Sequence, residues 1–146
     1  CPWTNRDSLL ITRSEFEQDL LTNYKSMKKF GVQKKEARFF MPPYEWYNDS
    51  IAASTASMGL QLINYSPGTI SHADYTTPDM KNYRGSEEIM LSIKRSSANL
   101  NGFILLLHIG TDPKRVDKFY KRLPELLHYL KSMGYEFVTI TQLLSE

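Results

Sequence analysis

The sequence predicts an α/β fold, in which the strands of a parallel sheet alternate with helices that flank the sheet. The clearest strand is the apolar run 103–107, which lies between Gly102 and Gly110 and leads directly into His108. Its length and composition are typical of a strand buried on both faces, as in parallel sheets. Segments with helical periodicity separate this run from the other short apolar runs. This alternation favours parallel strands joined by right-handed crossovers.

Composition limits the class of protein. The 146 residues, 41% hydrophobic and 23% charged, match one globular domain that is large enough to bury a sizeable core. The net charge of +2 gives little support for nucleic-acid binding, and no apolar run is long enough to span a membrane. The one cysteine excludes an intrachain disulfide. The sequence begins at Cys1 without a methionine or a visible secretory signal, which we interpret as a processed or truncated chain.

The first predicted element is a helix over about residues 15–30. Ser14 and Glu17 have the spacing of a capping box, with Ser14 as the N-cap, and Gly31 is a helix stop signal. Its apolar side chains recur at helical spacing; they are Phe16, Leu20, Tyr24 and Met27. Lysines gather near its end, and we interpret them as a solvated outer face.

The remaining predicted elements alternate in type along the chain. In order, they are a strand over 37–41, a helix over about 50–58, a strand over 60–65, a helix over about 86–97, the strand that ends at His108, a helix over 116–133, a strand over 135–140 and a terminal turn capped by Thr141. Either Asn48 or Asp49 caps the second helix. Pro124 implies a break or a fresh first turn in the 116–133 helix. Residues 66–85 form a long polar loop, and such loops are often functional.

Three of the predicted strands end in distinctive sequence. The first is followed by Pro42, Pro43 and Tyr44, the second by residues 65–68, and the third ends at His108. The carboxyl ends of parallel strands meet at one rim of a sheet, where α/β folds bind their ligands. This convergence predicts a functional site that includes His108.

Several stretches resemble the motifs of one enzyme family. Residues 38–44, which read RFFMPPY, resemble the third motif of the polysaccharide deacetylases, the NodB-homology or carbohydrate esterase family 4. Residues 106–108, which read LLH, resemble its fifth motif, and residues 126–138 resemble its C-terminal helix and strand. The resemblance runs in order over about residues 14–144. It implies that residues 1–146 are the C-terminal portion of a single deacetylase-like domain, a distorted (β/α) barrel of about seven strands.

The resemblance implies a reaction and residue roles. Members of the family hydrolyse acetyl groups from carbohydrates with a divalent metal, commonly zinc, which activates the attacking water. His108 would be the general acid that protonates the leaving amine. The backbone N–H of Tyr44 would donate to the oxyanion of the tetrahedral intermediate.

The resemblance also implies contacts with the substrate. Leu106 would line the acetyl pocket, and Pro43, Trp46 and Tyr47 would contact the sugar. Packing of the two aromatic rings of Trp46 and Tyr47 against the barrel mouth is the alternative. The implied substrate is an acetylated carbohydrate polymer, namely peptidoglycan, a chitin-like glycan or xylan. The implied location is secreted, periplasmic or at the cell surface.

The sequence departs from the family pattern at the metal site. The first motif, with two aspartates, and the second, a His-x-x-x-His pair, are absent, while His72, His108 and His128 lie in separate predicted elements. We therefore expect this chain to hold no metal by itself and to be inactive in isolation. Four strands also cannot close a barrel. The chain is predicted to need a complement, either the N-terminal half of the domain or another subunit.

Two further departures affect the predicted site. Met41 stands where the family has an arginine, and Arg38 is no substitute because positions 38 and 41 point to opposite faces of a strand. Gly68 stands where an aspartate is expected. Asp74, six residues further on, is a candidate replacement as an orienting carboxylate or as a contact to the substrate. A solvated loop aspartate is the alternative.

Three functions are compatible with these observations. The first is metal-dependent deacetylation of a carbohydrate, at a C–N bond outside peptides or at an acetyl ester. The second is a deacetylase-like module that binds glycan or a protein without catalysis, which Met41 and Gly68 favour. The third is a serine-type hydrolase that pairs His108 with Asp112, and it is weaker because the sequence has no G-x-S-x-G motif.

Overall fold

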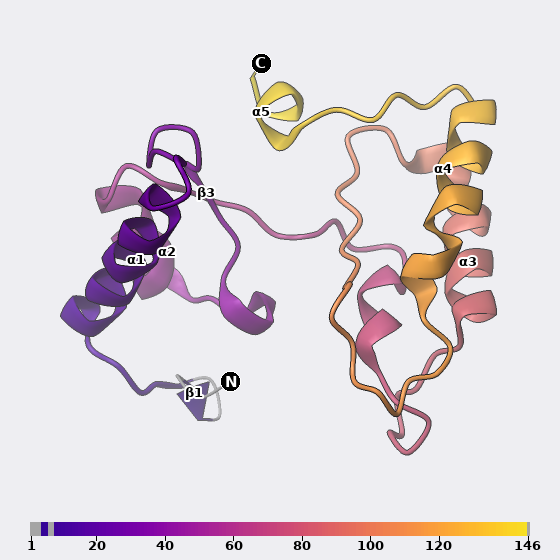
Figure 1. The fold of residues 1–146 in the computed structure, drawn as a ribbon, viewed down its shortest axis with the longest axis horizontal. Coiled ribbons are helices and arrows are strands. Elements are labelled where there is room, and N and C mark those ends of the chain that lie inside the picture. The colour runs from indigo at the N-terminus through magenta and orange to yellow at the C-terminus, as the bar shows by residue number, and fades with distance from the viewer. Residues whose placement is uncertain (1–3, 6–7, 146) are drawn as a thin grey trace. The chain divides into compact units, whose positions relative to one another are not determined.

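The computed structural model describes residues 4–5 and 8–145. By its internal contacts the chain divides into two compact units, Cys1–Asn64 and Tyr65–Glu146. Figure 1 colours the first unit from indigo to magenta and the second from magenta to yellow. Within the described ranges, no helix combines the length and the apolar character needed to cross a membrane.

The first unit combines helices with short paired strands. Its elements are β1 (Thr4–Asn5), β2 (Ser8–Leu9), α1 (Arg13–Lys28), β3 (Phe39–Phe40), the 3₁₀ helix η1 (Pro43–Glu45), α2 (Asp49–Ser57) and β4 (Gln61–Leu62). β1 pairs with β2 antiparallel, and β3 pairs with β4 in parallel, with Phe40 opposite Leu62. The parallel arrangement predicted for the strands at 37–41 and 60–65 is therefore confirmed, although both strands are shorter than predicted.

A small apolar core stabilises this unit. Phe16 and Leu20 of α1 are buried together with Ile51 of α2 and with Leu60. The ring of Phe16 packs edge-on against Phe40 of β3, with the ring centroids 5.7 Å apart. Of the apolar residues predicted at helical spacing in the first helix, Phe16 and Leu20 are thus buried in a core and Tyr24 packs against it.

The start of α1 corrects one sequence prediction. Its capping box consists of Thr12 and Glu15, so the predicted box of Ser14 and Glu17 is wrong. The Glu15 carboxylate accepts the Thr12 amide at 2.7 Å, and the Thr12 hydroxyl accepts the Glu15 amide at 3.2 Å. Both pairs fit the same Ser/Thr-x-x-Glu pattern, so the pattern alone cannot choose between them. Glu17 instead binds the Arg13 guanidinium at 2.5 Å.

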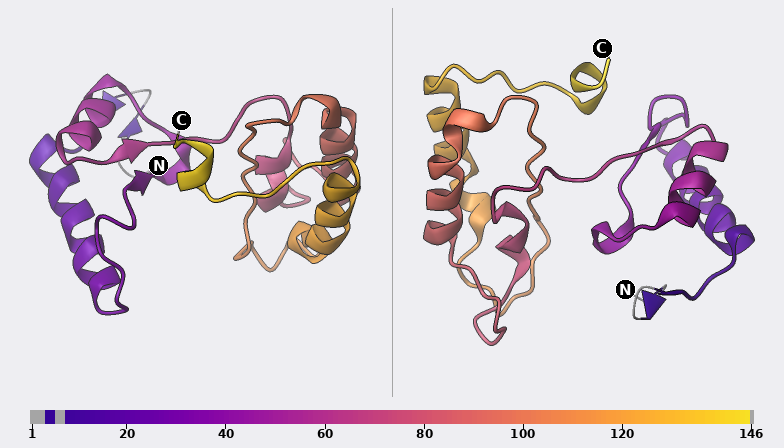
Figure 2. Two further views of the ribbon diagram at one scale, coloured as in Figure 1. Left: turned by 90° about the horizontal axis from the view of Figure 1, so that it is seen from above. Right: turned by 180° about the vertical axis from the view of Figure 1, so that it is seen from behind.

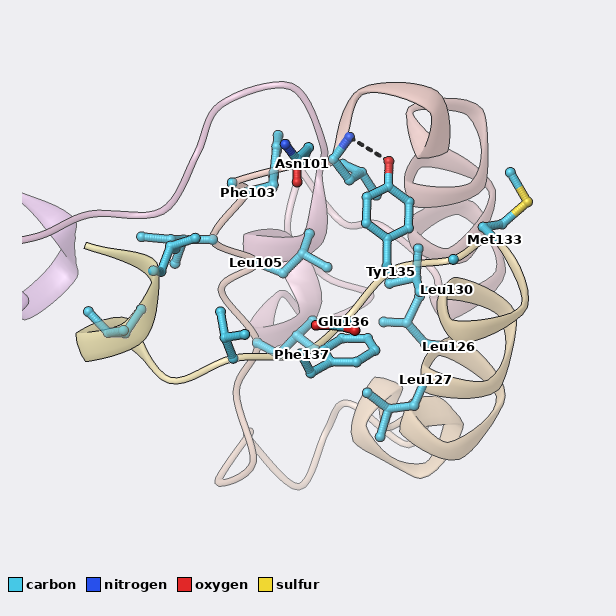
Figure 3. Close-up of a pocket in the computed structure, with 18 of the residues that line it drawn as sticks. Asn101, Phe103, Leu105, Leu126, Leu127, Leu130, Met133, Tyr135, Glu136 and Phe137 are labelled. Carbon is cyan, nitrogen blue, oxygen red and sulfur yellow. Dashed lines mark hydrogen bonds between the residues drawn. The ribbon is translucent and has the colours of Figure 1, made fainter. Parts of the chain in front are cut away.

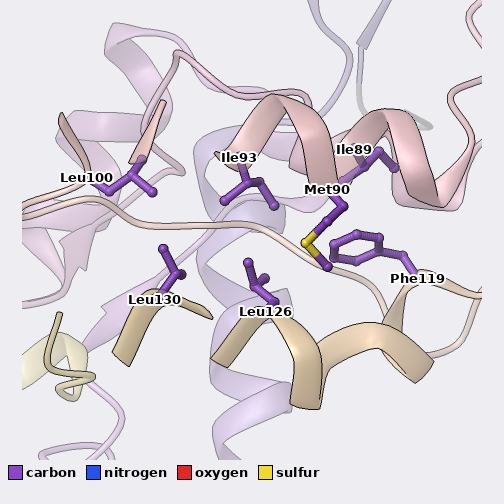
Figure 4. Close-up of a cluster of buried hydrophobic side chains, with 7 residues drawn as sticks. All are labelled: Ile89, Met90, Ile93, Leu100, Phe119, Leu126 and Leu130. Atoms are coloured by element: carbon purple, nitrogen blue, oxygen red, sulfur yellow. The ribbon is translucent and has the colours of Figure 1, made fainter. Parts of the chain in front are cut away.

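The second unit is built on two packed helices. Its elements are η2 (Ser71–Tyr75), α3 (Ser86–Arg95), η3 (Ser97–Asn99), η4 (Phe119–Arg122), α4 (Leu123–Ser132) and α5 (Ile140–Leu143). Helices α3 and α4 lie side by side (Figure 1; Figure 2). The buried apolar cluster between them consists of Ile89, Met90, Ile93, Leu100, Phe119, Leu126 and Leu130 (Figure 4).

Other helix starts follow local sequence signals. For α2, the Asn48 alternative is confirmed, because its side chain accepts the Ile51 amide at 3.0 Å. Pro124 lies in the first turn of α4, which confirms the predicted fresh turn at this proline. The cap of the terminal turn is Thr139 and not Thr141, because Thr139 forms a capping box three residues before Gln142.

The structure corrects the prediction of a strand that ends at His108. Residues 103–108 follow an extended path that is not a strand, and their side chains are half-buried where full burial was expected. The Ser66 amide donates to the Ile104 carbonyl at 2.9 Å. A strand needs a continuous ladder of such bonds to a neighbour, and apolar composition alone cannot supply one. Residues 135–139 are likewise not a strand.

The predicted fold class is therefore supported at a coarse level. Helices together with the parallel pair of β3 and β4 are compatible with an α/β fold. The barrel of about seven strands stays a prediction.

Candidate active site

The carboxylate of Asp74 contacts His108 through both of its oxygens. Asp74 Oδ1 lies 2.6 Å from His108 Nδ1, and Asp74 Oδ2 accepts the backbone N–H of His108 at 2.7 Å. Asp74 is 1% exposed, whereas 33% of the His108 side chain is exposed. A buried carboxylate therefore fixes both the backbone and the ring of a histidine that solvent can reach.

This contact determines which ring nitrogen of His108 can exchange a proton with a ligand. A carboxylate in its ionised form only accepts hydrogen bonds; with that form, Nδ1 carries the hydrogen that points to Asp74 and Nε2 is left for chemistry. Tyr75 packs edge-on against the imidazole, with centroids 5.3 Å apart and planes at 66°. Tyr75 is exposed, so the histidine and its aromatic neighbour lie at the surface of the unit.

Buried threonines hold the loop that carries Asp74. Thr76, directly after η2, donates its amide at 3.0 Å and its hydroxyl at 2.6 Å to the Ala73 carbonyl. The Thr76 hydroxyl oxygen also accepts the Arg84 amide at 3.2 Å. Thr76 and Thr77 are both buried. Because the surroundings of Asp74 are buried and hydrogen-bonded, the alternative of a solvated loop aspartate is wrong.

Asp112 is not the partner of the histidine. Its Oδ1 accepts the Lys114 amide at 2.8 Å, in a turn after the 103–108 segment. The carboxylate in contact with His108 belongs to Asp74. The pairing predicted for a serine-type hydrolase is therefore wrong.

The described residues do not fit the metal that the resemblance implies. Among them, no three His, Cys, Asp or Glu side chains come together in a group that could hold a metal ion. The ring of His72 stacks on Tyr65, with centroids 4.7 Å apart, and His128 is exposed on α4. Neither histidine adds a ligand beside His108.

Four predicted contact residues lie on or beside η1 in the first unit. Pro43 and Tyr44 belong to η1, and Trp46 and Tyr47 follow it. Tyr44 and Glu45 have φ angles of 58° and 57°, in the left-handed region that residues with side chains rarely adopt. Tyr44 and Tyr47 are exposed, whereas Trp46 packs partly buried against the apolar core of its unit.

An apolar cavity of about 750 Å³ lies in the second unit, apart from the Asp74–His108 pair. Figure 3 shows its walls, formed by the 100–107 segment, α4 and the residues that follow α4. Leu105, Leu126, Leu127 and Phe137 are among the side chains that line it. Leu106, predicted to line an acetyl pocket, is half-buried in the extended path and is not part of these walls.

Comparison with known proteins gives a distant relationship. No family model matches the chain. A peptidoglycan-N-acetylglucosamine deacetylase of Bacillus cereus is 28% identical to it over 130 residues. The match covers 89% of this chain and 54% of that protein, so the chain spans about half the length of this relative. A distant relationship to polysaccharide deacetylases is supported, in agreement with the motifs.

Sequence reasoning does not identify Arg115 or Thr76, although both are fully buried near the pair. Charged and hydroxyl residues in irregular segments are ordinarily exposed, and no periodic pattern distinguishes buried loop residues. The available signal is the run of Thr76 and Thr77 before Pro78, because short hydroxyl side chains beside a proline favour an ordered turn.

Proposed function

We propose that this chain carries the general acid of a carbohydrate deacetylase whose substrate is an acetylated amino-sugar polymer. The observation that carries the proposal is the contact of 2.6 Å between Asp74 and the Nδ1 atom of His108. The similarity to a peptidoglycan-N-acetylglucosamine deacetylase supports the same reaction and the same class of polymer.

The chemistry of the pair suits the breakdown of an acetamide. Hydrolysis adds the oxygen of water to the carbonyl carbon and breaks the C–N bond, and the amine leaves readily only when it receives a proton. In our proposal, protonated His108 gives its Nε2 hydrogen to that nitrogen. Asp74 accepts the Nδ1–H and stabilises the charged ring until the proton is transferred. The products are acetate and a free amine on the sugar.

Asp74 would compensate for one departure from the family pattern. The chain has Gly68 where that pattern has an aspartate. Asp74 contacts the histidine from η2 instead, through a carboxylate that is nearly completely buried. We propose that it takes over the orienting role.

The remaining predicted roles belong to the same proposal. The Tyr44 amide would donate to the oxyanion. The left-handed backbone of Tyr44, a conformation that residues with side chains rarely adopt, supports a functional role at this position. Leu106 would contact the acetyl methyl group, and Pro43, Trp46 and Tyr47 would contact sugar rings. The exposure of the Tyr47 ring supports a stacking contact, because aromatic faces pack well on the apolar faces of sugars.

We propose that the divalent metal, zinc by the resemblance, is bound by ligands outside the described residues. They would come from the same protein or from another subunit. A deacetylase of a cell-wall polymer has to reach that polymer, so we also propose a secreted, periplasmic or cell-surface location.

The test measures acetate release by the full-length protein from N-acetylated peptidoglycan with zinc supplied. We expect His108→Ala to lower the rate by about 10²-fold or more, because the leaving amine loses its proton donor. His128→Gln is the matched control, since His128 is exposed on α4, and it should leave the rate unchanged. An unchanged rate for His108→Ala would contradict the proposed role.

A second function is favoured by Met41 and Gly68, which stand where the family pattern has an arginine and an aspartate. A deacetylase-like module without catalysis would bind glycan or a protein partner. The same samples decide between the two functions. Binding to peptidoglycan without acetate release, from this polymer or from acetylated xylan, would support the module and overturn the enzyme.

A further inference from the structure

Arg115 is the largest fully buried side chain in the described part of the protein. Burial of a guanidinium is costly unless its hydrogens are bound, because the charge loses its hydration. Its contacts therefore show which part of the structure depends on it.

The guanidinium of Arg115 holds both ends of the loop over residues 76–86. Arg115 Nη1 donates to the Thr76 carbonyl at 2.7 Å and to the Arg84 carbonyl at 3.0 Å, and Nη2 lies 3.5 Å from Ser86 Oγ. The same group lies over the ring of Tyr83, 5.3 Å from its centroid. Nε has no hydrogen-bond partner in the described residues, so the two terminal nitrogens make these bonds.

Asp117 extends this contact. Its Oδ2 accepts the Ser86 amide at 2.5 Å, and its backbone carbonyl accepts the Ser86 hydroxyl at 3.2 Å. Thr76 lies two residues after Asp74, and Arg115 and Asp117 both follow His108. The contacts therefore tie the segment after Asp74 to the segment after His108.

We propose that Arg115 is a positioning residue for the Asp74–His108 pair. Without it, the carbonyls of Thr76, which is fully buried, and of Arg84 lose the donor that joins them, which favours movement of the loop. Because that loop continues directly from η2, its movement displaces Asp74 from His108. The catalytic consequence rests on the proposed function, whereas the geometry of the pair can be measured without it.

The test is NMR spectroscopy of the full-length protein with Arg115→Met. One readout is the resonance of the His108 Nδ1–H, and the other is hydrogen exchange of the His108 backbone amide. We expect the resonance to disappear and the amide to exchange at least about tenfold faster, because both hydrogen bonds to Asp74 open. Amides of the α3–α4 core, such as those of Ile89 and Leu126, should keep their protection.

Arg122→Met is the matched control. Arg122 is another arginine of this unit and is ion-paired with Glu87 at 2.6 Å and Glu125 at 2.8 Å. Among the described residues it makes no hydrogen bond with the 76–86 loop. We expect this variant to leave both His108 signals unchanged. A change of the same size in Arg122→Met would overturn the proposal, since the effect would then not be specific to Arg115.

Two further outcomes are decisive. A folded Arg115→Met variant that keeps the Nδ1–H resonance and the wild-type exchange rate would overturn the proposal. If Arg115→Met does not fold, Arg115→Lys keeps the charge but lacks the planar fork, and we expect faster exchange at His108; a wild-type rate would overturn the proposal. Failure of the proposed function looks different, because acetate release is then absent while the effect of Arg115→Met on His108 persists.

Discussion

Two buried clusters of the second unit have similar burial and opposite chemistry. The cluster between α3 and α4 is apolar, with Ile89 and Ile93 at 0% exposure (Figure 4). The cluster around the 76–86 loop is polar, with Asp74 at 1% and Arg115 at 0% exposure. Apolar contacts are not directional, so they hold helices together without fixing single atoms. Hydrogen bonds are directional, so the polar cluster fixes the positions of individual atoms.

This difference separates the part that stabilises the unit from the part that contains the candidate site. The apolar cavity of the unit is lined by the 100–107 segment and α4, and neither Asp74 nor His108 lines it. The Asp74–His108 pair lies instead where polar groups are buried. The candidate site therefore lies among buried polar residues and outside the lining of the cavity.

The largest effect on stability is expected from the apolar cluster. Phe119→Ala removes a ring that is 1% exposed and leaves a cavity between η4 and α3. We expect the free energy of unfolding to fall by about 3–5 kcal/mol, measured by chemical denaturation. Phe30→Ala is the control, because Phe30 is 86% exposed, and it should change stability by less than about 0.5 kcal/mol. Equal effects at the two positions would show that the cluster is not the core.

A smaller and more local effect is expected from the polar cluster. Asp74→Asn keeps the shape of the side chain but loses the charge that accepts two hydrogen bonds from His108. We expect the free energy of local opening at the His108 amide to fall by about 1–3 kcal/mol, measured by hydrogen exchange. Asp79→Asn, in the adjoining 76–86 loop, should leave that amide unchanged. Protection of the His108 amide that survives Asp74→Asn would argue against the contact.

The smallest effect is a pH dependence at the edge of the polar cluster. Partial burial raises the pKa of the Asp117 carboxyl, but hydrogen bonds from Ser86 and the charges of Arg115 and Arg122 outweigh it, so its pKa lies below the usual value. A carboxyl whose pKa is lower in the folded state stabilises the fold at pH values above its unfolded-state pKa. This stabilisation is lost as the pH falls through the folded-state pKa. We expect stability to drop below about pH 4, and to drop less in Asp117→Asn. Identical acid unfolding of both proteins would contradict this assignment.

The sequence predicts helices better than strands in this chain, for a physical reason. Helical hydrogen bonds and caps are local, so Asn48 and Pro124 mark helix starts that the structure confirms. A strand depends on a neighbour that lies far away in the sequence. The apolar run before His108 is not a strand, and its composition alone could not show whether it would be paired.

The candidate site shows the same limit. His108 stands out because it ends an apolar run, and Asp74 stands out as an acid near a glycine that replaces an aspartate. Their contact spans a sequence separation of 34 residues, so only the folded chain can show it. Arg115 is harder to predict, because an arginine in a loop is ordinarily exposed and its burial depends on carbonyls of a distant segment.

A double-mutant cycle tests the central claim most directly, that Asp74 and His108 act as one catalytic unit. Acetate release by the full-length protein is measured for Asp74→Asn, His108→Ala and the double variant. Our account predicts that Asp74→Asn lowers kcat/KM by about 10²-fold in the wild-type background and has no further effect once His108 is alanine, because groups that act together are not additive. Equal losses from Asp74→Asn in both backgrounds would contradict the account.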